Sequence, residues 1–152
     1  MAIRMKSEVT LRANATCPSH SRTDVSVRDL VFSIDEPTER GGTNSGPTPT
    51  DTALAALIGC TNVIGNKCAA KLGVDIGHLE IQASCTFDRR GVTLEEEIDN
   101  PFRHIDLTIS YDGPASAEDV ERVAGDVRKY CPLSILFRQA GTEIRETWQK
   151  ST

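Results

Sequence analysis

The sequence predicts an α+β fold with six strands and three helices. Two observations carry this prediction. A long apolar stretch, residues 46–73, has the start, the end and the composition of one central helix. Around it lie stretches in which apolar and polar residues alternate, as they do in strands with one buried face. In order, the elements are β-β-β-α-β-β-α-α-β, which is typical of an α+β domain. We expect one domain over residues 1–152.

Composition and charge argue against several classes of protein. Charged residues make up 26% of the chain and hydrophobic residues 38%, as in an ordinary soluble globular protein. A net charge of −5 with only 5% aromatic residues argues against a nucleic-acid partner. The N-terminal segment carries frequent charges and lacks the apolar core of a signal peptide. The five cysteines form no CxxC pair, so we expect free thiols in a cytoplasmic protein without a membrane partner.

The first third of the chain is predicted to form strands and loops. Residues 5–13 alternate weakly and indicate a first strand, whereas the polar residues 14–24 indicate a loop. Residues 23–34 favour β structure but change phase, which requires a bulge or turn near Arg28 and Asp29. Residues 35–47 are rich in glycine and proline and form the connection to the central helix.

The central helix has clear signals at both ends. Thr48 is the expected N-cap, Pro49 the first helical residue and Asp51 the partner in a capping box, while Gly73 ends the helix. Residues 53–60 contain no charged or strongly polar side chain, so we expect this part to be buried on all sides. The run is too short to span a membrane. Cys60 therefore lies at the centre of the most buried element.

The second half of the chain continues with two strands, two helices and a strand. Residues 76–87 and 104–112 alternate cleanly, and the region between them is an acidic turn. Ser116 caps the next helix, whose apolar residues recur at helical spacing up to Cys131. Pro132 stops that helix because it lacks a backbone N–H. A third helix runs to residue 139, and residues 144–148 form the closing strand.

Metal and histidine chemistry have weak support in the sequence. The three histidines are scattered, and only Cys17 and His20 stand at a metal-like spacing, which is half of a zinc site. No histidine is placed beside Cys60 to activate it as in a cysteine protease. Gly41 and Gly42 do not form a phosphate-binding loop between a strand and a helix. We expect neither a metal nor a cofactor.

Among the thiols, Cys60 and Cys131 occupy special positions, whereas Cys68 and Cys85 are expected to be core residues. Cys131 precedes a proline between two helices, so it is expected to cap the third helix. A thiolate there would feel the positive end of the helix dipole, which lowers the pKa of a cysteine. The residues alone leave open whether the two thiols are reactive or only buried.

Two motifs resemble a known family. The stretch GPTPTDTALAALIGCTNV and the later KYCPL, residues 129–133, are similar to the two cysteine motifs of osmotically inducible protein C (OsmC) and organic hydroperoxide resistance (Ohr) proteins. The resemblance extends over about residues 7–148. It implies an OsmC-like two-layer fold in which two chains intertwine around their long central helices as a homodimer. The active sites then lie at the subunit interface.

The resemblance also implies a chemistry. Proteins of this family reduce hydroperoxides with thiols and without a cofactor, and they prefer organic hydroperoxides. By analogy Cys60 is the peroxidatic thiol and Cys131 the resolving thiol. The two form a disulfide that an external dithiol, typically a lipoylated protein, reduces again.

The family pairs its reactive thiol with an arginine and a carboxylate. Arg28 is the candidate arginine, with Arg22 and Arg40 as alternatives. The family's usual glutamate directly after the proline is replaced here by Thr50, and Asp51 is the candidate substitute. This departure favours an alternative, a small-ligand-binding or redox-sensing protein with little peroxidase turnover. A purely structural dimer is the second alternative.

Overall fold

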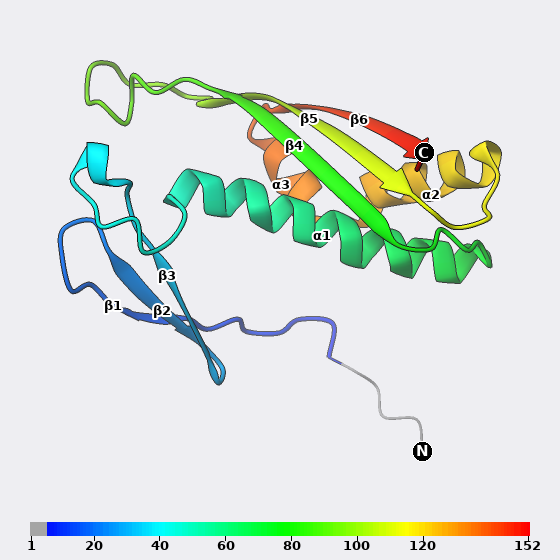
Figure 1. Cartoon of the computed structure of the whole chain (residues 1–152), viewed down its shortest axis with the longest axis horizontal. Helices are drawn as coiled ribbons and strands as arrows, with labels where there is room; N and C mark the ends of the chain where they lie inside the picture. The colour runs from blue at the N-terminus through cyan, green and yellow to red at the C-terminus, as the bar shows by residue number, and fades with distance from the viewer. Residues whose placement is uncertain (1–5) are drawn as a thin grey trace. The chain divides into compact units, whose positions relative to one another are not determined.

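The computed structural model describes residues 6–152, and its elements follow the predicted order (Figure 1). The α+β class is confirmed. The chain divides into two units, residues 1–52 and 53–152, which are described separately. The elements are β1 (Asn14–Thr16), β2 (Thr23–Val27), β3 (Leu30–Ile34), the 3-10 turn η1 (Thr38–Arg40), α1 (Pro49–Leu72), β4 (Leu79–Phe87), β5 (Phe102–Tyr111), α2 (Ala117–Tyr130), α3 (Pro132–Gln139) and β6 (Glu143–Lys150).

The N-terminal unit contains an antiparallel sheet in the order β1-β2-β3. Val27 pairs with Leu30, so Arg28 and Asp29 form a two-residue turn, and Arg28 has a left-handed φ of 56°. This is the turn that the change of phase predicts. Odd-numbered residues of β2 face even-numbered residues of β3 across the pair, which places both apolar sets on one face.

The predicted first strand is wrong. Residues 6–13 form no strand in the part of the chain that the structure describes, and β1 lies instead in the predicted loop. Residue 5 lies outside the described residues. Val9 is 76% exposed and Leu11 is 90% exposed, so the alternating side chains have no surface to cover within their own chain. Alternation predicts a strand only where a neighbouring strand is available.

Asp35 organises the connection between β3 and α1. Its buried carboxylate accepts hydrogen bonds from the Thr43 hydroxyl at 2.6 Å and from the backbone N–H groups of Glu36, Thr43 and Ser45 at 2.8–3.1 Å. The Thr43 hydroxyl and these N–H groups hold the pKa of Asp35 well below its usual range. The glycine-rich segment is therefore folded around one carboxylate rather than being a loose linker.

The predicted ends of α1 are confirmed. The Asp51 N–H donates to Thr48 Oγ1 at 3.1 Å, and the Thr48 hydroxyl donates to the Asp51 carboxylate at 2.7 Å. The Thr48 N–H also points to that carboxylate, at 3.4 Å, which completes the capping box. Gly73 has a left-handed φ of 68° and follows the last helical residue.

The second unit is a sheet covered on one face by helices (Figure 1). Its strand order is β4-β5-β6, with β5 antiparallel to β4 and parallel to β6. The inward residues of β5 and the apolar stripe of α2 are buried against each other, as their periods predict. The most buried of these residues are Ile105, Leu107, Ile109, Val123 and Val127.

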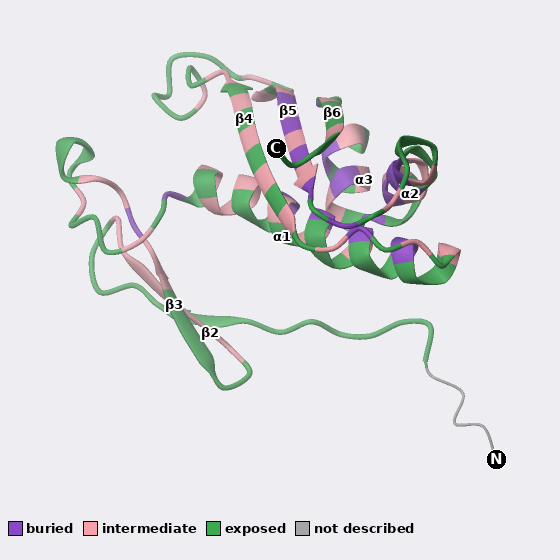
Figure 2. Ribbon diagram, turned by 45° about the vertical axis from the view of Figure 1, so that its right-hand side comes forward, coloured by how far each residue is buried: buried purple, intermediate pink, exposed green. Residues whose placement is uncertain are grey.

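The expectation that α1 is buried on all sides is wrong for the single chain. The buried residues recur along one side, at Leu57, Thr61, Gly65, Cys68 and Ala69, whereas Val63 is 50% exposed. Figure 2 shows the same division along the helix. By length and composition alone α1 also qualifies as a membrane span, a test that the core helix of a soluble protein passes as well. Within residues 53–152 the sheet and α2 cover one side of α1, whereas Ala55, Ala56 and Gly59 on the opposite side are exposed.

Candidate functional site

The side of α1 that packs against the core carries Cys60. The helix places it one turn after the fully buried Leu57 and beside the buried Thr61, and its own side chain is half-buried. The Thr61 hydroxyl donates to the Leu57 carbonyl at 2.8 Å, so this polar side chain is satisfied within the helix. The Cys60 sulfur thus lies at the edge of the apolar core, within reach of both protein and solvent.

Cys131 lies where α2 ends and α3 begins. Its N–H donates to the Val127 carbonyl at 2.9 Å as the last bond of α2, and its carbonyl accepts the first bond of α3 from Ile135 at 3.0 Å. Its sulfur accepts from the Ser134 N–H at 3.5 Å, so Cys131 is the N-cap of α3, as predicted. Pro132 ends α2, and the chain turns at Cys131 into α3, which we call the α2–α3 corner. The Cys131 thiol at this corner is fully buried.

The two cysteines that the sequence singles out meet in the structure. The Cys131 thiol donates a hydrogen bond to the Cys60 sulfur, and the two sulfurs are 3.0 Å apart although 71 residues separate them in the chain. Both are free thiols. A disulfide has a sulfur–sulfur distance of about 2.05 Å, so bond formation requires an approach of only about 1 Å.

The expectation that the helix terminus makes Cys131 acidic is wrong. Burial, followed by the hydrogen bond with Cys60, raises the pKa of Cys131 to about 11, although the N–H groups of Ser134 and Leu133 act in the opposite direction. Cys131 is therefore a neutral thiol at physiological pH. A neutral thiol keeps its proton, which is the proton that it donates to the Cys60 sulfur.

The remaining cysteines do not join this pair. Burial raises the pKa of Cys68 and of Cys85, consistent with the core role predicted for both. Cys17 is exposed and lies 3.8 Å from the Thr23 hydroxyl. Within residues 6–152 no group of three or more metal-binding side chains is present.

A pocket of about 200 Å³ lies between α1 and α2. Ile64, one helical turn after Cys60, and Tyr130, which directly precedes Cys131, are part of its lining. Lys71 lies over the Tyr130 ring at 5.8 Å from the ring centre. Ile64, Cys68 and the ring give the pocket an apolar interior, and its other lining residues are Lys67, Lys71 and Asp126.

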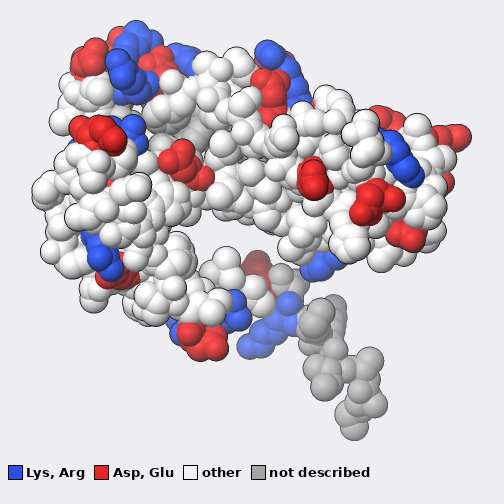
Figure 3. Space-filling view, in the orientation of Figure 1, with Lys and Arg blue, Asp and Glu red and all other residues white. Residues whose placement is uncertain are grey.

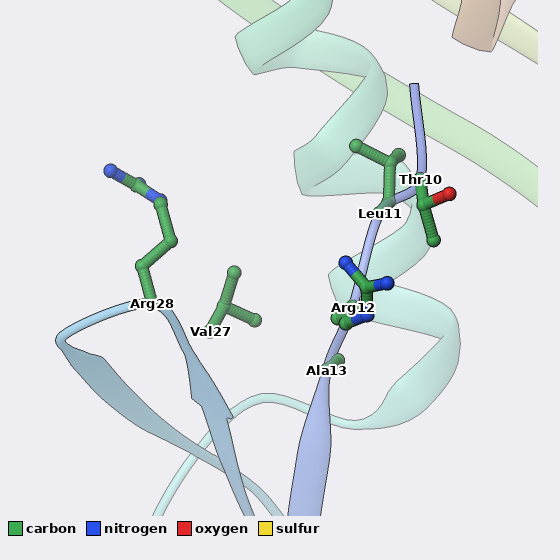
Figure 4. Close-up of a pocket in the computed structure, with 6 residues that line it drawn as sticks. All are labelled: Thr10, Leu11, Arg12, Ala13, Val27 and Arg28. Atoms are coloured by element: carbon green, nitrogen blue, oxygen red, sulfur yellow. The ribbon is translucent and has the colours of Figure 1, made fainter. Parts of the chain in front are cut away.

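The predicted arginine and carboxylate belong to the N-terminal unit. Arg28 lines a hollow with residues 10–13 and Val27, and its side chain extends away from Leu11 and Arg12 (Figure 4). Asp51 is engaged with Thr48 in the helix cap. The roles of Arg28 and Asp51 toward the thiols remain predictions.

The alternative arginines are already paired locally. Arg22 contacts Asp24 at 2.9 Å and Arg40 contacts Glu36 at 2.7 Å. Arg28 has no ion pair with any residue in the range 6–152 that the structure describes. Of the three candidates, Arg28 is the one whose guanidinium is left available.

The sequence analysis missed one buried charge near this site. Glu146 lies on the inward face of β6 with its side chain only 2% exposed, and it faces Arg128 and Arg138. The alternation along β6 could have predicted this burial, because Glu146 lies midway between the inward residues Ile144 and Trp148 at a period of two. Elsewhere, acidic and basic side chains are intermingled on the face that Figure 3 shows.

Comparisons with known proteins agree with the fold of the chain. The family model described as OsmC-like protein matches residues 42–147. An OsmC-like protein from Mycoplasma pneumoniae has a similar structure at 17% identity, covering 95% of this chain and 99% of that one, with a TM-score of 0.79. An organic hydroperoxide resistance protein OsmC from Legionella pneumophila is similar at 16% identity, covering 97% of this chain and 100% of that one, with a TM-score of 0.69. OhrB of Bacillus subtilis is similar at 18% identity, covering 92% of this chain and 98% of that one, with a TM-score of 0.60. A search of curated proteins finds no match.

The raised pKa of Cys131 predicts a stability change in alkaline solution. The unfolded chain loses this proton near pH 9, whereas the folded chain keeps it until about pH 11, so folding stability falls as the pH rises between these values. Relative to Cys131→Ser, the fully reduced wild type should lose about 2 kcal/mol of unfolding free energy between about pH 8 and pH 10.5. Urea unfolding of both proteins measures this. A difference that does not change with pH would show that Cys131 is not shifted.

Proposed function

The chain belongs to the OsmC-like protein family, and on that premise we propose that it is a thiol-dependent peroxidase that reduces organic hydroperoxides in defence against oxidative stress. The observation that carries the proposal is the 3.0 Å separation of the Cys60 and Cys131 sulfurs at the edge of the core. The proteins of similar structure include organic hydroperoxide resistance proteins, which is consistent with this reaction.

In the first step the Cys60 thiolate attacks the outer oxygen of the hydroperoxide. The sulfur–oxygen bond forms as the oxygen–oxygen bond breaks, and the alkoxide leaves and takes a proton to become the alcohol. Cys60 is oxidised to a sulfenic acid. Cys60 suits this role because its side chain is half-buried, whereas Cys131 is fully buried and neutral. A hydrogen bond from the Cys131 thiol stabilises negative charge on the Cys60 sulfur.

In the second step Cys131 condenses with the sulfenic acid. The Cys131 sulfur displaces hydroxide from Cys60, the two sulfurs bond, and water leaves with the Cys131 proton. The step needs only a small displacement, because the sulfurs start 3.0 Å apart. An external dithiol, such as a lipoylated protein, then reduces the disulfide by thiol exchange and is itself oxidised to a disulfide.

The pocket between α1 and α2 supplies a place for the organic part of the substrate. It begins one turn from Cys60 and has an apolar interior formed by Ile64, Cys68 and the Tyr130 ring. A hydrophobic tail in this pocket would bring the peroxide group to the sulfur pair and favour organic hydroperoxides over hydrogen peroxide. The volume of about 200 Å³ suits a small organic group.

A homodimer in the cytoplasm is part of the proposal. The exposed apolar side of α1 includes Val63, and Val9 and Leu11 of the alternating segment are exposed as well. A second copy would bury both surfaces, as exposed apolar patches of this kind do in oligomers. Arg28 of either subunit would then act on Cys60.

The alternative function is small-ligand binding or redox sensing with little turnover. Thr50 favours it, since the Thr50 hydroxyl lies 3.1 Å from the Thr48 hydroxyl within the helix cap and supplies no carboxylate. Steady turnover of cumene hydroperoxide with a dithiol reductant separates the two functions. A single oxidation without turnover would support the sensor.

The roles of the two cysteines can be separated by substitution. One equivalent of cumene hydroperoxide should remove two hydrogens from the wild type and add one oxygen to Cys131→Ser, whose sulfenic acid dimedone traps. Cys60→Ser should not react, because the remaining thiol is buried and neutral. Intact-mass spectrometry measures all three. Dimedone labelling of Cys131 in Cys60→Ser would reverse the assignment.

The role of Arg28 predicts a loss of rate. Arg28→Met removes the cation but keeps much of the apolar stem, and loss of a close opposite charge lowers the thiolate fraction by about tenfold or more. The reaction of Cys60 with peroxide at pH 7 should slow by the same factor in stopped-flow measurements. Arg22→Met and Arg40→Met serve as controls, since both arginines are paired locally. Slowing in a control but not in Arg28→Met would identify a different arginine.

The proposed assembly predicts that folding depends on concentration. Sedimentation at micromolar concentration should give a dimer, and dilution should lower the melting temperature, since association stabilises only the folded chains. Val63→Glu places a charge on the exposed side of α1 and should shift the equilibrium to monomer. A folded wild-type monomer at that concentration would contradict the proposal.

A further inference from the structure

A buried carboxylate lies between two arginines that flank Cys131 in the chain. Glu146 Oε2 is 3.6 Å from Arg128 Nη1, and Glu146 Oε1 is 3.7 Å from Arg138 Nη2. The Glu146 side chain is 2% exposed, whereas the two arginines are 39% and 32% exposed. Across the sheet its neighbour on β5 is Leu107, which is apolar. One charged group of β6 is thus enclosed between two guanidinium groups from two different helices.

The two arginines stand on either side of Cys131 in the chain. Arg128 is in the last turn of α2 and Arg138 is in the last turn of α3. A carboxylate that attracts both guanidiniums draws the two helices toward one point on β6. The angle between α2 and α3 sets where the corner lies, and the corner carries the Cys131 sulfur. The ionic contacts therefore act on the geometry of the thiol pair without touching it.

We propose that Glu146 is a positioning residue that holds the α2–α3 corner through Arg128 and Arg138, so that Cys131 can close the disulfide with Cys60. The inference rests on the proposed peroxidase function for its biological meaning. The closure itself is a property of the two thiols and is testable with any oxidant of thiols.

The energetics separate this role from simple stabilisation. Burial raises the pKa of Glu146, and the two arginines only oppose that effect. A raised pKa in the folded state means that stability is greatest below the ordinary pKa of glutamate and falls as the pH rises through the shifted value. The ionised carboxylate is therefore a cost to folding at neutral pH. An isosteric neutral side chain should leave stability unchanged or increase it.

One oxygen of the Glu146 carboxylate also lacks a hydrogen-bond partner in the described part of the chain. Among residues 6–152, Glu146 Oε2 and Trp148 Nε1 are buried polar atoms without a hydrogen-bond partner. The charged groups that face the carboxylate are Arg128 of α2 and Arg138 of α3. Glu121 of α2 lies behind Arg128 and pairs with it. The two arginines and, to a smaller extent, the Trp148 side chain favour the ionised carboxylate, and protonation of Glu146 removes its attraction for the arginines.

The test compares Glu146→Gln with Glu143→Gln. Glu143 is a matched control because it lies on the same strand, is exposed and pairs with Arg145 at 3.0 Å. After one equivalent of cumene hydroperoxide, Glu146→Gln should form the sulfenic acid at the wild-type rate but close the disulfide about tenfold to a hundredfold more slowly, as misplaced reacting groups do. Rapid quenching and mass spectrometry resolve the two steps. Glu143→Gln should match the wild type in both.

The pH dependence provides a readout that packing alone would not move. We compare the rate of disulfide closure in the wild type with that in Glu146→Gln. The ratio of the two rates should fall toward one as the pH decreases through the titration of Glu146, because the wild-type side chain is then neutral as well. The ratio of wild type to Glu143→Gln should stay at one. Glu146→Asp, which keeps the charge, should recover part of the rate at neutral pH.

Several outcomes would overturn the inference. Equal closure rates in Glu146→Gln and the wild type would do so, as would slow closure accompanied by a lower melting temperature. If Glu146→Gln does not fold, Arg138→Gln should show the same selective slowing, and wild-type closure in that variant would also overturn the inference. Diamide oxidation keeps the two proposals apart. If no variant forms a sulfenic acid, the peroxidase proposal fails, while closure with diamide still decides the role of Glu146.

Discussion

The structure of the site depends on one steric constraint, the proline at position 132. Without an N–H, Pro132 ends α2, and it holds Cys131 in an extended conformation, with φ −71° and ψ 110°. Cys131 can then serve as the last residue of one helix and the cap of the next. An unbroken helix would carry the chain away from the core, whereas the corner turns the thiol toward α1 and Cys60.

The same corner shows that burial outweighs a helix terminus. The field at the end of a helix contributes about 0.3–1 kcal/mol, which is less than one pKa unit. Burial and the neighbouring sulfur act in the opposite direction and raise the pKa of Cys131 from 9.0 to about 11. Full burial of Cys131 but not of Cys60 thereby makes the two thiols chemically different. The neutral Cys131 thiol donates a hydrogen bond, and the half-buried Cys60 is the thiol that we propose to react.

Local patterns predicted much of the fold, because caps and periodicity act over a few residues. The capping box of Thr48 and Asp51, the turn at Arg28 and the apolar stripe of α2 are of this kind. The errors concern contacts between distant segments, such as the absent strand at residues 6–13 and the one-sided burial of α1. The meeting of Cys60 and Cys131 was expected only through the family resemblance, and Glu146 required the register of a strand against two helices.

Two ionisable groups are buried beside the α2–α3 corner, Cys131 within it and Glu146 against it. Burial raises the pKa of each, but only the Glu146 carboxylate costs stability at neutral pH, because the Cys131 thiol is neutral there in both the folded and the unfolded chain. A buried charge that opposes stability is most easily understood where geometry is needed. A methyl group in place of the thiol could not close a disulfide, and a neutral side chain on β6 could not attract both arginines. The cost of burying Glu146 is therefore consistent with the positioning role that we propose for it.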